Sequence, residues 1–400
     1  MTLLIDPPSW PGRGRLWSHL VSDTSVEELH EFASLAGIPA RGFERDHYDV
    51  PAEVYHALVG AGARPVSSRE VVAALAVAGL RRRKSESSAA RRPGRELVRP
   101  RRLQVGDTIG VVAPAGPVPR ARLDKGIEVL ESFKLRVRLG RHVLSGDSAV
   151  SYLAGSDEQR AADFEACWVD PEVRAVIMAR GGYGCQRMIG HIDWRALRNA
   201  EPKVLVGFSD LTALQHAVAS HLGLVTLHGP GVTSLADVVD GDSVESLRRT
   251  LLEPESSMGS LASTAEAVVP GVAEGVLTGG NVALLAAGVG TPEHRPAAGC
   301  IAVLEDVGEE PFRLDRQLTQ LLRAGWFQGV RGLALGTFES CGDAELVESV
   351  LAERLGSLGA PMVMGLPFGH GSRNLAIPLG VRARLDAGAG TLTPLTPGLR

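Results

Sequence analysis

The sequence predicts an α/β protein in which an open parallel sheet is covered by helices and a small, separate α/β domain precedes it. A chain of 400 residues with 44 % hydrophobic content has room for two or three domains. After residue 103, apolar strands alternate with amphipathic helices, and the strands are continuous runs of Val, Ile and Leu. Such runs are typical of strands buried on both faces of a parallel sheet.

The composition limits the classes of protein to consider. The N-terminal stretch MTLLIDPPSWPGRGR lacks the basic and then apolar pattern of a signal peptide. No apolar run reaches the roughly 18–20 residues that span a bilayer. We therefore expect a soluble, cytoplasmic protein without a membrane partner. The cysteines lack CxxC spacing and indicate neither a disulfide framework nor a zinc ribbon: Cys167, Cys185, Cys300 and Cys341.

A basic segment separates the N-terminal region from the rest. Residues 81–102 carry ten basic and two acidic side chains, a charge of +8 within a chain whose formal charge is −4, so the remainder is −12. Such a run can bind nucleic acid, but this one lacks aromatic residues and is rich in Ser, Ala and Pro. We expect a solvated linker at 82–102 and no nucleic-acid partner.

The N-terminal region, residues 1–81, is expected to hold a strand at Leu3–Ile5, a helix capped by one of residues 23–25, and a second helix around Ser68–Leu80. The three candidate caps are Asp23, Thr24 and Ser25. Its His and Asp residues have the chemistry of metal ligands, although such residues also serve as caps and core hydrogen-bond partners. We favour the second interpretation and predict no metal. The residues concerned are Asp6, His19, Asp23, His30, Asp46, His47 and Asp49.

From residue 107 the elements follow in order. The strand in DTIGVVAPAG precedes a helix over 120–134, a short strand at 136–140 and a helix over 156–170. A strand at 173–180 then leads into the glycine loop GGYG and a further helix, and Val204–Val206 forms a strand before GFSD and another helix. Ligands of open α/β sheets bind beyond the carboxyl ends of the strands. ARGGYG and VGFSD both lie there.

Ser209, in VGFSD, is a candidate nucleophile at a strand-to-helix turn. A serine in such a turn can point outward beside the free N–H groups of the following helix. Attack on a carbonyl also needs donors for the oxyanion, and the backbone amides of Gly182 and Asp210 are the candidates. GFSD lacks the second glycine of the G-x-S-x-G elbow, and Ser or Asp is common at a helix N-cap. On this motif alone both interpretations stay open.

A serine nucleophile needs a base, and the base needs a carboxylate to orient it. The strand Ile301–Leu304 ends in Glu305 and Asp306, either of which is placed for function or for capping the next helix. His370 stands between two glycines after another apolar strand. These residues are candidates for the carboxylate and the base.

Five motifs in this order resemble the LD-carboxypeptidases and the related microcin C immunity peptidases: ARGGYG, KVLVGFSD, GGNVALL, VLEDVGEEPFRLDRQLTQL and GLPFGH. The resemblance covers about residues 103–395. It implies a Ser-Glu-His triad, which falls on Ser209, Glu305 and His370. It also implies oxyanion donors at Gly182 and Asp210, and a position near the substrate at Asn281.

The resemblance also implies an architecture. An α/β domain at 103–240 carries the nucleophile, residues 241–270 connect, and a β-rich α/β domain at 271–400 carries the glutamate and the histidine. The active site lies in the cleft between them, and family members are commonly homodimers. The HLVSD and DHYDVP stretches of residues 1–81 resemble a small bacterial domain family of unknown function, which implies no activity.

The implied function is that of a serine carboxypeptidase that releases a C-terminal D-amino acid from murein tetrapeptides during cell-wall recycling, without a metal or organic cofactor. The nearest alternative is hydrolysis of a toxic peptide–nucleotide conjugate. Glu309 and Glu310 favour the muropeptide, because microcin-type members carry basic residues there. A more distant alternative is a nucleotide-binding protein or kinase that uses GGYG, but Tyr183 stands where an acid would hold Mg²⁺. Cys185 is expected to be a packing residue.

Overall fold

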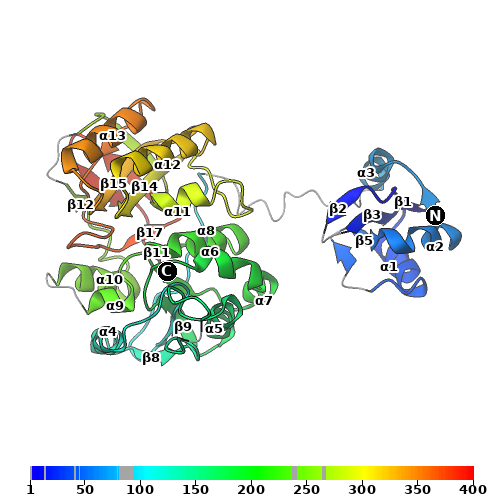
Figure 1. Ribbon diagram of the computed structural model, residues 1–400, viewed down its shortest axis with the longest axis horizontal. Helices are drawn as coiled ribbons and strands as arrows, with labels where there is room; N and C mark the ends of the chain where they lie inside the picture. The colour runs from blue at the N-terminus through cyan, green and yellow to red at the C-terminus, as the bar shows by residue number, and fades with distance from the viewer. Residues whose placement is uncertain are drawn as a thin grey trace. The chain divides into compact units, whose positions relative to one another are not determined.

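The computed structural model describes residues 2–12, 15–39, 42–44, 46–78, 80, 94–146, 148–236, 241–263 and 267–400. The chain forms two compact units, Met1–Ala89 and Ala90–Arg400 (Figure 1). None of the helices in these described ranges combines the length and apolarity that crossing a membrane requires.

The first unit is built on one six-stranded sheet with the order β4-β5-β3-β1-β6, and β2 pairs with β3. Its strands are β1 (Leu3–Ile5), β2 (Trp10–Gly12), β3 (Arg15–Ser22), β4 (Phe43–Glu44), β5 (His47–Pro51) and β6 (Arg64–Pro65), and its helices are α1 (Val26–Leu35), η2 (Ala52–Val54), α2 (Tyr55–Gly60) and α3 (Ser68–Val77). Ser25 caps α1 by accepting a hydrogen bond from the amide of Glu28 at 3.1 Å, which selects it among the three predicted caps.

The sheet of the first unit is buried on both faces. Ile5 and Leu20 belong to one apolar cluster, together with residues of α1 and α2. Leu4 and Val21, their neighbours in sequence, belong to a second cluster with residues of α3. Side chains alternate between the faces of a strand, so adjacent apolar residues need a cover on each side. The predicted strand and both predicted helices of this unit are confirmed.

The second unit contains two sheets, and the first has the order β17-β11-β10-β9-β7-β8. Its strands are β7 (Thr108–Val112), β8 (Arg136–Leu139), β9 (Val173–Met178), β10 (Val204–Gly207), β11 (Thr226–His228) and β17 (Ile377–Leu379). Strands β7 to β11 are parallel, as predicted, and only β17 is antiparallel to its neighbour β11.

Helices cover both faces of this sheet (Figure 1). They are α4 (Arg120–Ser132), α5 (Asp157–Val169), α6 (Cys185–Met188), η3 (Ile189–His191), α7 (Trp194–Asn199), α8 (Leu211–His221), α9 (Val232–Leu235) and α10 (Asp242–Leu252). Residues of α4, α9 and α10 pack on one face and residues of α5, α6 and α8 on the other. Each strand and helix predicted between residues 107 and 221 is present.

The strand order reverses at β7, which lies between β8 and β9. In open α/β sheets, ligands usually bind at such a switch point, outside the carboxyl ends of the strands. The amide of Gly116, after β7, donates a hydrogen bond to the carbonyl of Gly181, after β9, at 3.1 Å. The glycine loop is thus fixed at the switch point, beside the end of β10.

The second sheet of this unit has the order β12-β19-β18-β13-β14-β15-β16. Its strands are β12 (Leu261–Ala262), β13 (Val272–Asn281), β14 (Cys300–Val307), β15 (Gly332–Glu339), β16 (Met362–Val363), β18 (Arg382–Asp386) and β19 (Thr391–Pro394), and its helices are α11 (Val282–Ala287), α12 (Pro311–Arg323) and α13 (Ala344–Gly356). Strands β13 to β16 are parallel. Strand β14 continues through Glu305 and Asp306, beyond the predicted end at Leu304.

Several segments tie the two sheets together. Residues 241–270, predicted as a connection, begin with α10, whose Leu247 and Leu251 lie in the core of the first sheet. Strand β17 returns from the C-terminal half to the edge of β11. Of the predicted linker, residues 82–93 lie outside the described residues, and from Gly94 the chain packs on this unit: the amide of Leu97 donates to the carbonyl of Gly380 at 2.8 Å.

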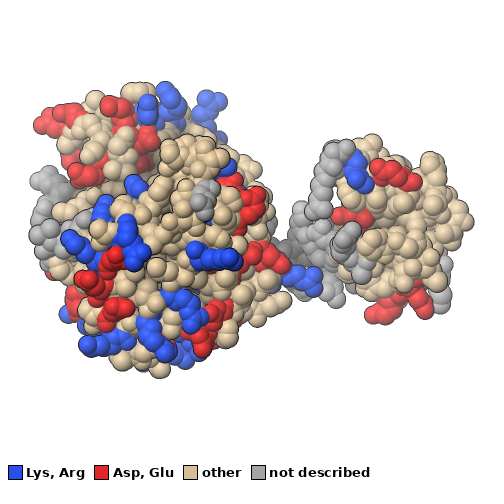
Figure 2. All heavy atoms as spheres, turned by 60° about the horizontal axis from the view of Figure 1, so that its bottom comes forward, with Lys and Arg blue, Asp and Glu red and all other residues tan. Residues whose placement is uncertain are grey.

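Charged side chains of both signs are interspersed on the surface of the second unit (Figure 2). Many form ion pairs; Arg248, for example, pairs with Glu245 at 2.7 Å and with Glu253 at 2.8 Å. Exposed pairs of this kind contribute little stability each. The apolar cores therefore carry most of the folding free energy of this unit.

The close packing of α4 on α9 gives a prediction. A Cβ atom added to Gly126, within α4, would lie 1.9 Å from the carbonyl oxygen of Val232. Gly126→Ala should therefore lower the free energy of unfolding by about 1–3 kcal/mol in denaturant titrations. Gly356→Ala is the matched control, because this helical glycine has no neighbouring atom within 4 Å. If both variants are equally stable, α4 and α9 do not pack this closely.

Candidate active site

The turn after β10 has an unusual backbone. Ser209 has a φ of +61°, in the left-handed region that non-glycine residues rarely adopt. A strained serine between a strand and a helix is the geometry of a nucleophile elbow, which lifts the hydroxyl above the sheet edge. Ser209 is half-buried, and its hydroxyl makes no hydrogen bond to another described residue. The side chain is therefore free to engage a ligand.

The glycine loop after β9 borders Ser209. A Cβ atom added to Gly181 would lie 3.2 Å from Cβ and 3.3 Å from the hydroxyl oxygen of Ser209, so any other residue here would crowd the serine. The neighbouring Gly182 has a φ of +119°. Over the described part of the chain, no hydrogen bond occupies the amides of Gly182 and Asp210. Both predicted oxyanion donors are thus unused.

The side chain of Asp210 has a structural position. It is 1 % exposed, and its carboxylate accepts a hydrogen bond from the amide of Cys185 at 2.7 Å. This bond joins the first turns of α6 and α8, which follow the two loops. Burial raises the pKa of Asp210, although the bond to Cys185 opposes the shift. Asp210 therefore fixes the glycine loop against the serine turn.

Glu305 and His370 form the central hydrogen bond of the site. Glu305 is fully buried in β14, and its Oε2 atom lies 2.6 Å from Nδ1 of His370. Burial would raise the pKa of Glu305, but His228 and His370 outweigh it and lower the pKa to about 2. The carboxylate is ionised at neutral pH and accepts a hydrogen bond from Nδ1–H. In the neutral imidazole, Nε2 then carries the lone pair.

Two residues that the sequence analysis missed, Thr337 and Asn374, hold the His370 loop. The hydroxyl of Thr337, in β15, accepts a hydrogen bond from the amide of Gly371 at 2.9 Å and donates to the carbonyl of Phe368 at 3.2 Å. The amide of Gly369 donates to Oδ1 of Asn374 at 3.1 Å. The loop begins several residues after β16, which ends at Val363. These contacts join distant segments, so no local pattern announces them.

His370 also contacts the serine turn. Its ring lies 4.7 Å from the ring of Phe208, centroid to centroid, and Phe208 immediately precedes Ser209. The structure therefore brings the second sheet's Glu305–His370 pair to the end of β10 in the first sheet. No hydrogen bond links Ser209 to His370 among the described residues, and such bonds often tighten only when substrate binds.

His228 is a further histidine at this site, at the end of β11. It is fully buried, and its Nε2 atom lies 3.8 Å from the other carboxylate oxygen of Glu305, which is beyond hydrogen-bond distance. Both ring nitrogens and Oε1 of Glu305 lack a hydrogen-bond partner among the described residues. His370 was singled out because it stands between two glycines after an apolar strand, and LHGP carries part of that pattern, a histidine at the end of a buried strand with one glycine after it.

Asn281 and Asp306 form a separate buried pair beside Glu305. The Oδ1 atom of Asn281 caps α11 by accepting from the amide of Leu284, and its Nδ2 donates to Asp306 at 2.8 Å. Asp306 also accepts from the amides of Ala283 and Val307. Burial and the charge of Glu305 raise the pKa of Asp306 to about 6 although these donors oppose it. Both polar groups of Asn281, predicted near the substrate, are engaged within the fold.

Three other residues discussed in the sequence analysis, Cys185, Tyr183 and Glu310, take no part in this hydrogen-bonded site. Cys185 is fully buried, and burial and the nearby Asp210 raise the pKa of its thiol well above the ordinary value, so a thiolate is disfavoured. Tyr183 is 48 % exposed and packs edge-on against Tyr152, with ring centroids 5.8 Å apart. Glu310 is the exposed N-cap residue of α12.

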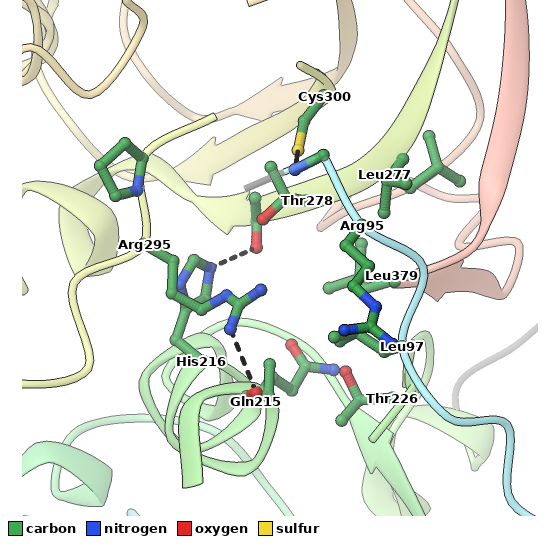
Figure 3. Close-up of a pocket in the computed structure, with 16 residues that line it drawn as sticks. Arg95, Leu97, Gln215, His216, Thr226, Leu277, Thr278, Arg295, Cys300 and Leu379 are labelled. Carbon is green, nitrogen blue, oxygen red and sulfur yellow. Dashed lines mark hydrogen bonds between the residues drawn. The ribbon is translucent and has the colours of Figure 1, made fainter. Parts of the chain in front are cut away.

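A cavity of about 30 Å³ lies between α8, β13 and the segment that begins at Gly94 (Figure 3). Gln215 donates hydrogen bonds to the carbonyls of Gly207 and Leu227 at 3.0 Å, beneath the serine turn. His216 Nε2 lies 3.1 Å from the carbonyl of Gly279, and burial lowers its pKa to about 4. A neutral His216 therefore donates from α8 to β13 and links the two sheets.

Comparison with known proteins assigns the second unit to the peptidases. More narrowly, the chain belongs to the LD-carboxypeptidase family: the family's N-terminal domain matches residues 109–229 and its C-terminal domain matches residues 274–385. Residues 3–78 match a protein of unknown function (DUF4031). Both resemblances inferred from the sequence motifs are confirmed.

Two individual relatives with carboxypeptidase names are consistent with this family. A putative carboxypeptidase of Streptomyces coelicolor is 51 % identical over 76 % of this chain and 98 % of its own length. A murein tetrapeptide carboxypeptidase of Pseudomonas aeruginosa is 36 % identical over 70 % of this chain and 92 % of its own.

Solved structures share the fold. The crystal structure of a muramoyltetrapeptide carboxypeptidase from Oxalobacter formigenes has a TM-score of 0.63 at 29 % identity and covers 71 % of this chain and 97 % of its own. The microcin C7 self immunity protein MccF, in complex with aspartyl sulfamoyl adenosine, has a TM-score of 0.68 at 23 % identity and covers 76 % of this chain and 100 % of its own. The second similarity shows the fold alone.

The buried Asp306 gives a prediction about pH. Its pKa near 6 in the folded protein lies above the ordinary value of 3.8, so folding favours the protonated form. Stability should therefore decrease as the pH rises from about 4 through 6. Asp306→Asn cannot ionise, and its unfolding free energy relative to wild type should rise by about 1–2 kcal/mol between pH 5 and 7.5. Urea titrations at both pH values measure this difference. Asp124→Asn, at an exposed carboxylate, is the control, and an equal difference at both pH values for Asp306→Asn contradicts the assignment.

Proposed function

We propose that this protein is a serine carboxypeptidase that cleaves the bond between an L-configured centre and a terminal D-amino acid in murein tetrapeptides. The observation that carries the proposal is the 2.6 Å hydrogen bond between buried Glu305 and His370, next to a serine turn with positive φ. An ionised carboxylate, an imidazole and a strained serine are the parts of a serine-hydrolase triad.

In the proposed mechanism, the Ser209 hydroxyl attacks the carbonyl carbon of the scissile bond and Nε2 of His370 accepts its proton. Glu305 accepts a hydrogen bond from Nδ1–H of His370, which fixes the tautomer and stabilises the imidazolium, while the proton stays on Nδ1. The amides of Gly182 and Asp210 donate to the oxyanion. Collapse of the intermediate releases the D-amino acid, which takes the proton from His370, and water then hydrolyses the acyl-enzyme. None of these steps uses a metal or organic cofactor.

The choice of substrate rests on the relatives. The relative from Pseudomonas aeruginosa, named a murein tetrapeptide carboxypeptidase, is 36 % identical over 70 % of this chain. Identity to MccF is lower, at 23 %. Glu309 and Glu310 add negative charge after β14, which disfavours a nucleotide phosphate in this region. The proposal places the reaction in the cytoplasm, in cell-wall recycling, and the enzyme as a homodimer, as the family resemblance implies.

The decisive experiment compares substrates. The full chain is incubated with murein tetrapeptides that differ only in the configuration of the last residue, and with an aminoacyl sulfamoyl adenosine, and release is followed by mass spectrometry. We expect release of D-alanine from the tetrapeptide that ends in the D-residue and little from the L-epimer. Faster cleavage of the sulfamoyl adenosine conjugate would instead support the immunity function.

The assignment of the nucleophile gives a second test at this site. Ser209→Ala should leave the fold intact and lower hydrolysis by several orders of magnitude, because the covalent route is lost. Cys185→Ala is the control, since this thiol is buried and its pKa is raised. If Ser209→Ala keeps turnover within about tenfold of wild type, Ser209 is not the nucleophile.

The assignment of the carboxylate is tested by two adjacent variants. Glu305→Gln keeps a hydrogen bond to His370 but cannot stabilise the imidazolium, so kcat/KM should fall by roughly 10²–10⁴. Asp306→Asn should lower kcat/KM by less than about tenfold, because Asp306 bonds to Asn281 and to backbone amides and not to His370. The reverse order of damage would transfer the role to Asp306.

A further inference from the structure

The first unit contains a cluster of metal-ligating side chains. His19 lies in β3 and His47 and Asp49 lie in β5, and His19 is the antiparallel partner of Asp49. Residues two apart in a strand share a face, so the register places all three side chains on the same face of the sheet. Their donor atoms lie within 4.8 Å of one another.

Each of the two histidine rings is oriented by an aspartate that is not one of the three candidate ligands. Nδ1 of His19 lies 3.0 Å from Asp6, and Nδ1 of His47 lies 2.8 Å from Asp46. A carboxylate that accepts a hydrogen bond from Nδ1–H leaves the Nε2 lone pair available. This carboxylate–histidine pairing is the usual arrangement around histidine ligands of metals. It occurs twice here, for two rings that meet edge-on with centroids 4.9 Å apart.

The Nε2 atoms converge on one oxygen. Nε2 of His47 lies 3.3 Å and Nε2 of His19 lies 3.9 Å from Oδ1 of Asp49. Two donors bound to a tetrahedral ion at 2.0–2.1 Å are about 3.3–3.4 Å apart. One distance already matches this value, and the other needs a shift of about 0.5 Å, within reach of a rotation of the half-exposed Asp49 side chain.

Asp6 makes the arrangement rigid. It is fully buried and accepts hydrogen bonds from the indole of Trp10 at 3.1 Å, the hydroxyl of Ser68 at 2.6 Å and the amide of His19 at 2.6 Å. Burial would raise its pKa, but these donors and the His19 ring lower it to about 2, so the carboxylate is ionised. The ring of His19 cannot turn without breaking this network.

A purely structural ion-pair network is the alternative. Asp6 raises the pKa of His19, so a protonated ring would offset part of the negative charge. However, neither Asp6 nor Asp49 pairs with a lysine or arginine among the described residues. The negative charge of Asp6 and Asp49 is one that a bound divalent cation would offset. Both Nε2 atoms also face the same carboxylate oxygen, which a charge network alone does not require.

We propose that His19, His47 and Asp49 bind a divalent transition-metal ion, with Zn²⁺ the best match for two imidazoles and one carboxylate. The side chains of His19 and His47 are about one quarter exposed and that of Asp49 is 39 % exposed. Three protein ligands and an open side leave at least one coordination position for water or another ligand, as in catalytic rather than structural zinc sites. This site is independent of the proposed peptidase function.

The test uses the full chain without an affinity tag, stripped with a chelator and exchanged into metal-free buffer. Zn²⁺ binding is measured by calorimetry, and bound metal is measured by elemental analysis after gel filtration. We expect about one Zn²⁺ per chain with a dissociation constant below 1 μM. His19→Ala, His47→Ala and Asp49→Asn should each weaken binding by at least 100-fold. His56→Ala, at an exposed histidine of the same unit, should bind like wild type.

Two further measurements separate a metal site from general damage to the unit. Asp46→Asn keeps every ligand atom and should weaken binding by about 10–100-fold. Asp49→Asn changes a half-exposed side chain, and its thermal melting should match that of wild type. Co²⁺ in place of Zn²⁺ should give visible absorption bands that His47→Ala abolishes. Binding weaker than about 100 μM in wild type, or full stoichiometry in both histidine variants, overturns the proposal.

Discussion

The second unit is organised around the burial of one charge. Glu305 lies in the middle of a parallel sheet, where an isolated carboxylate would be costly, and His370 satisfies it at 2.6 Å. This contact requires the His370 loop to fold back over β14, and Thr337 and Asn374 hold the loop there. It also brings the imidazole against Phe208, at the end of a strand in the other sheet. The position of the serine turn relative to His370 is therefore a consequence of how the buried carboxylate is hydrogen-bonded.

The sequence predicted local structure well because local signals determine it. Ser156 and Gln159 form a capping box at the start of α5, and the apolar runs of β7, β9 and β10 identify buried parallel strands. The sequence did not predict the positions of residues that depend on pairing between strands far apart in the chain. His228 acquires its position only when β11 pairs with β10, which sets it beside Glu305. The cluster in the first unit likewise depends on the antiparallel register that places His19 opposite Asp49.

Asn281 illustrates a different limit of sequence reasoning. A motif can place a residue near a site without revealing which of its atoms are already engaged. Asn281 is paired in register with Glu305, yet its oxygen caps α11 and its amide nitrogen binds Asp306. The two adjacent acidic residues of β14 consequently have opposite environments. Glu305 faces the histidines and has a pKa near 2, whereas Asp306 faces α11 and has a pKa near 6. Alternation along a strand produces this separation.

The return of β17 to the first sheet has a consequence for synthesis on the ribosome. Strand β11 receives its outer neighbour from Ile377–Leu379, and Leu399 completes the apolar core beneath the same sheet. Both segments leave the exit tunnel long after the serine turn, so until then the first sheet has an unpaired edge and an incomplete core. Glu305 and His370 also emerge late. Translation therefore separates Ser209 from Glu305 and His370 in time, and these residues come together only when the C-terminal half has folded onto the first sheet.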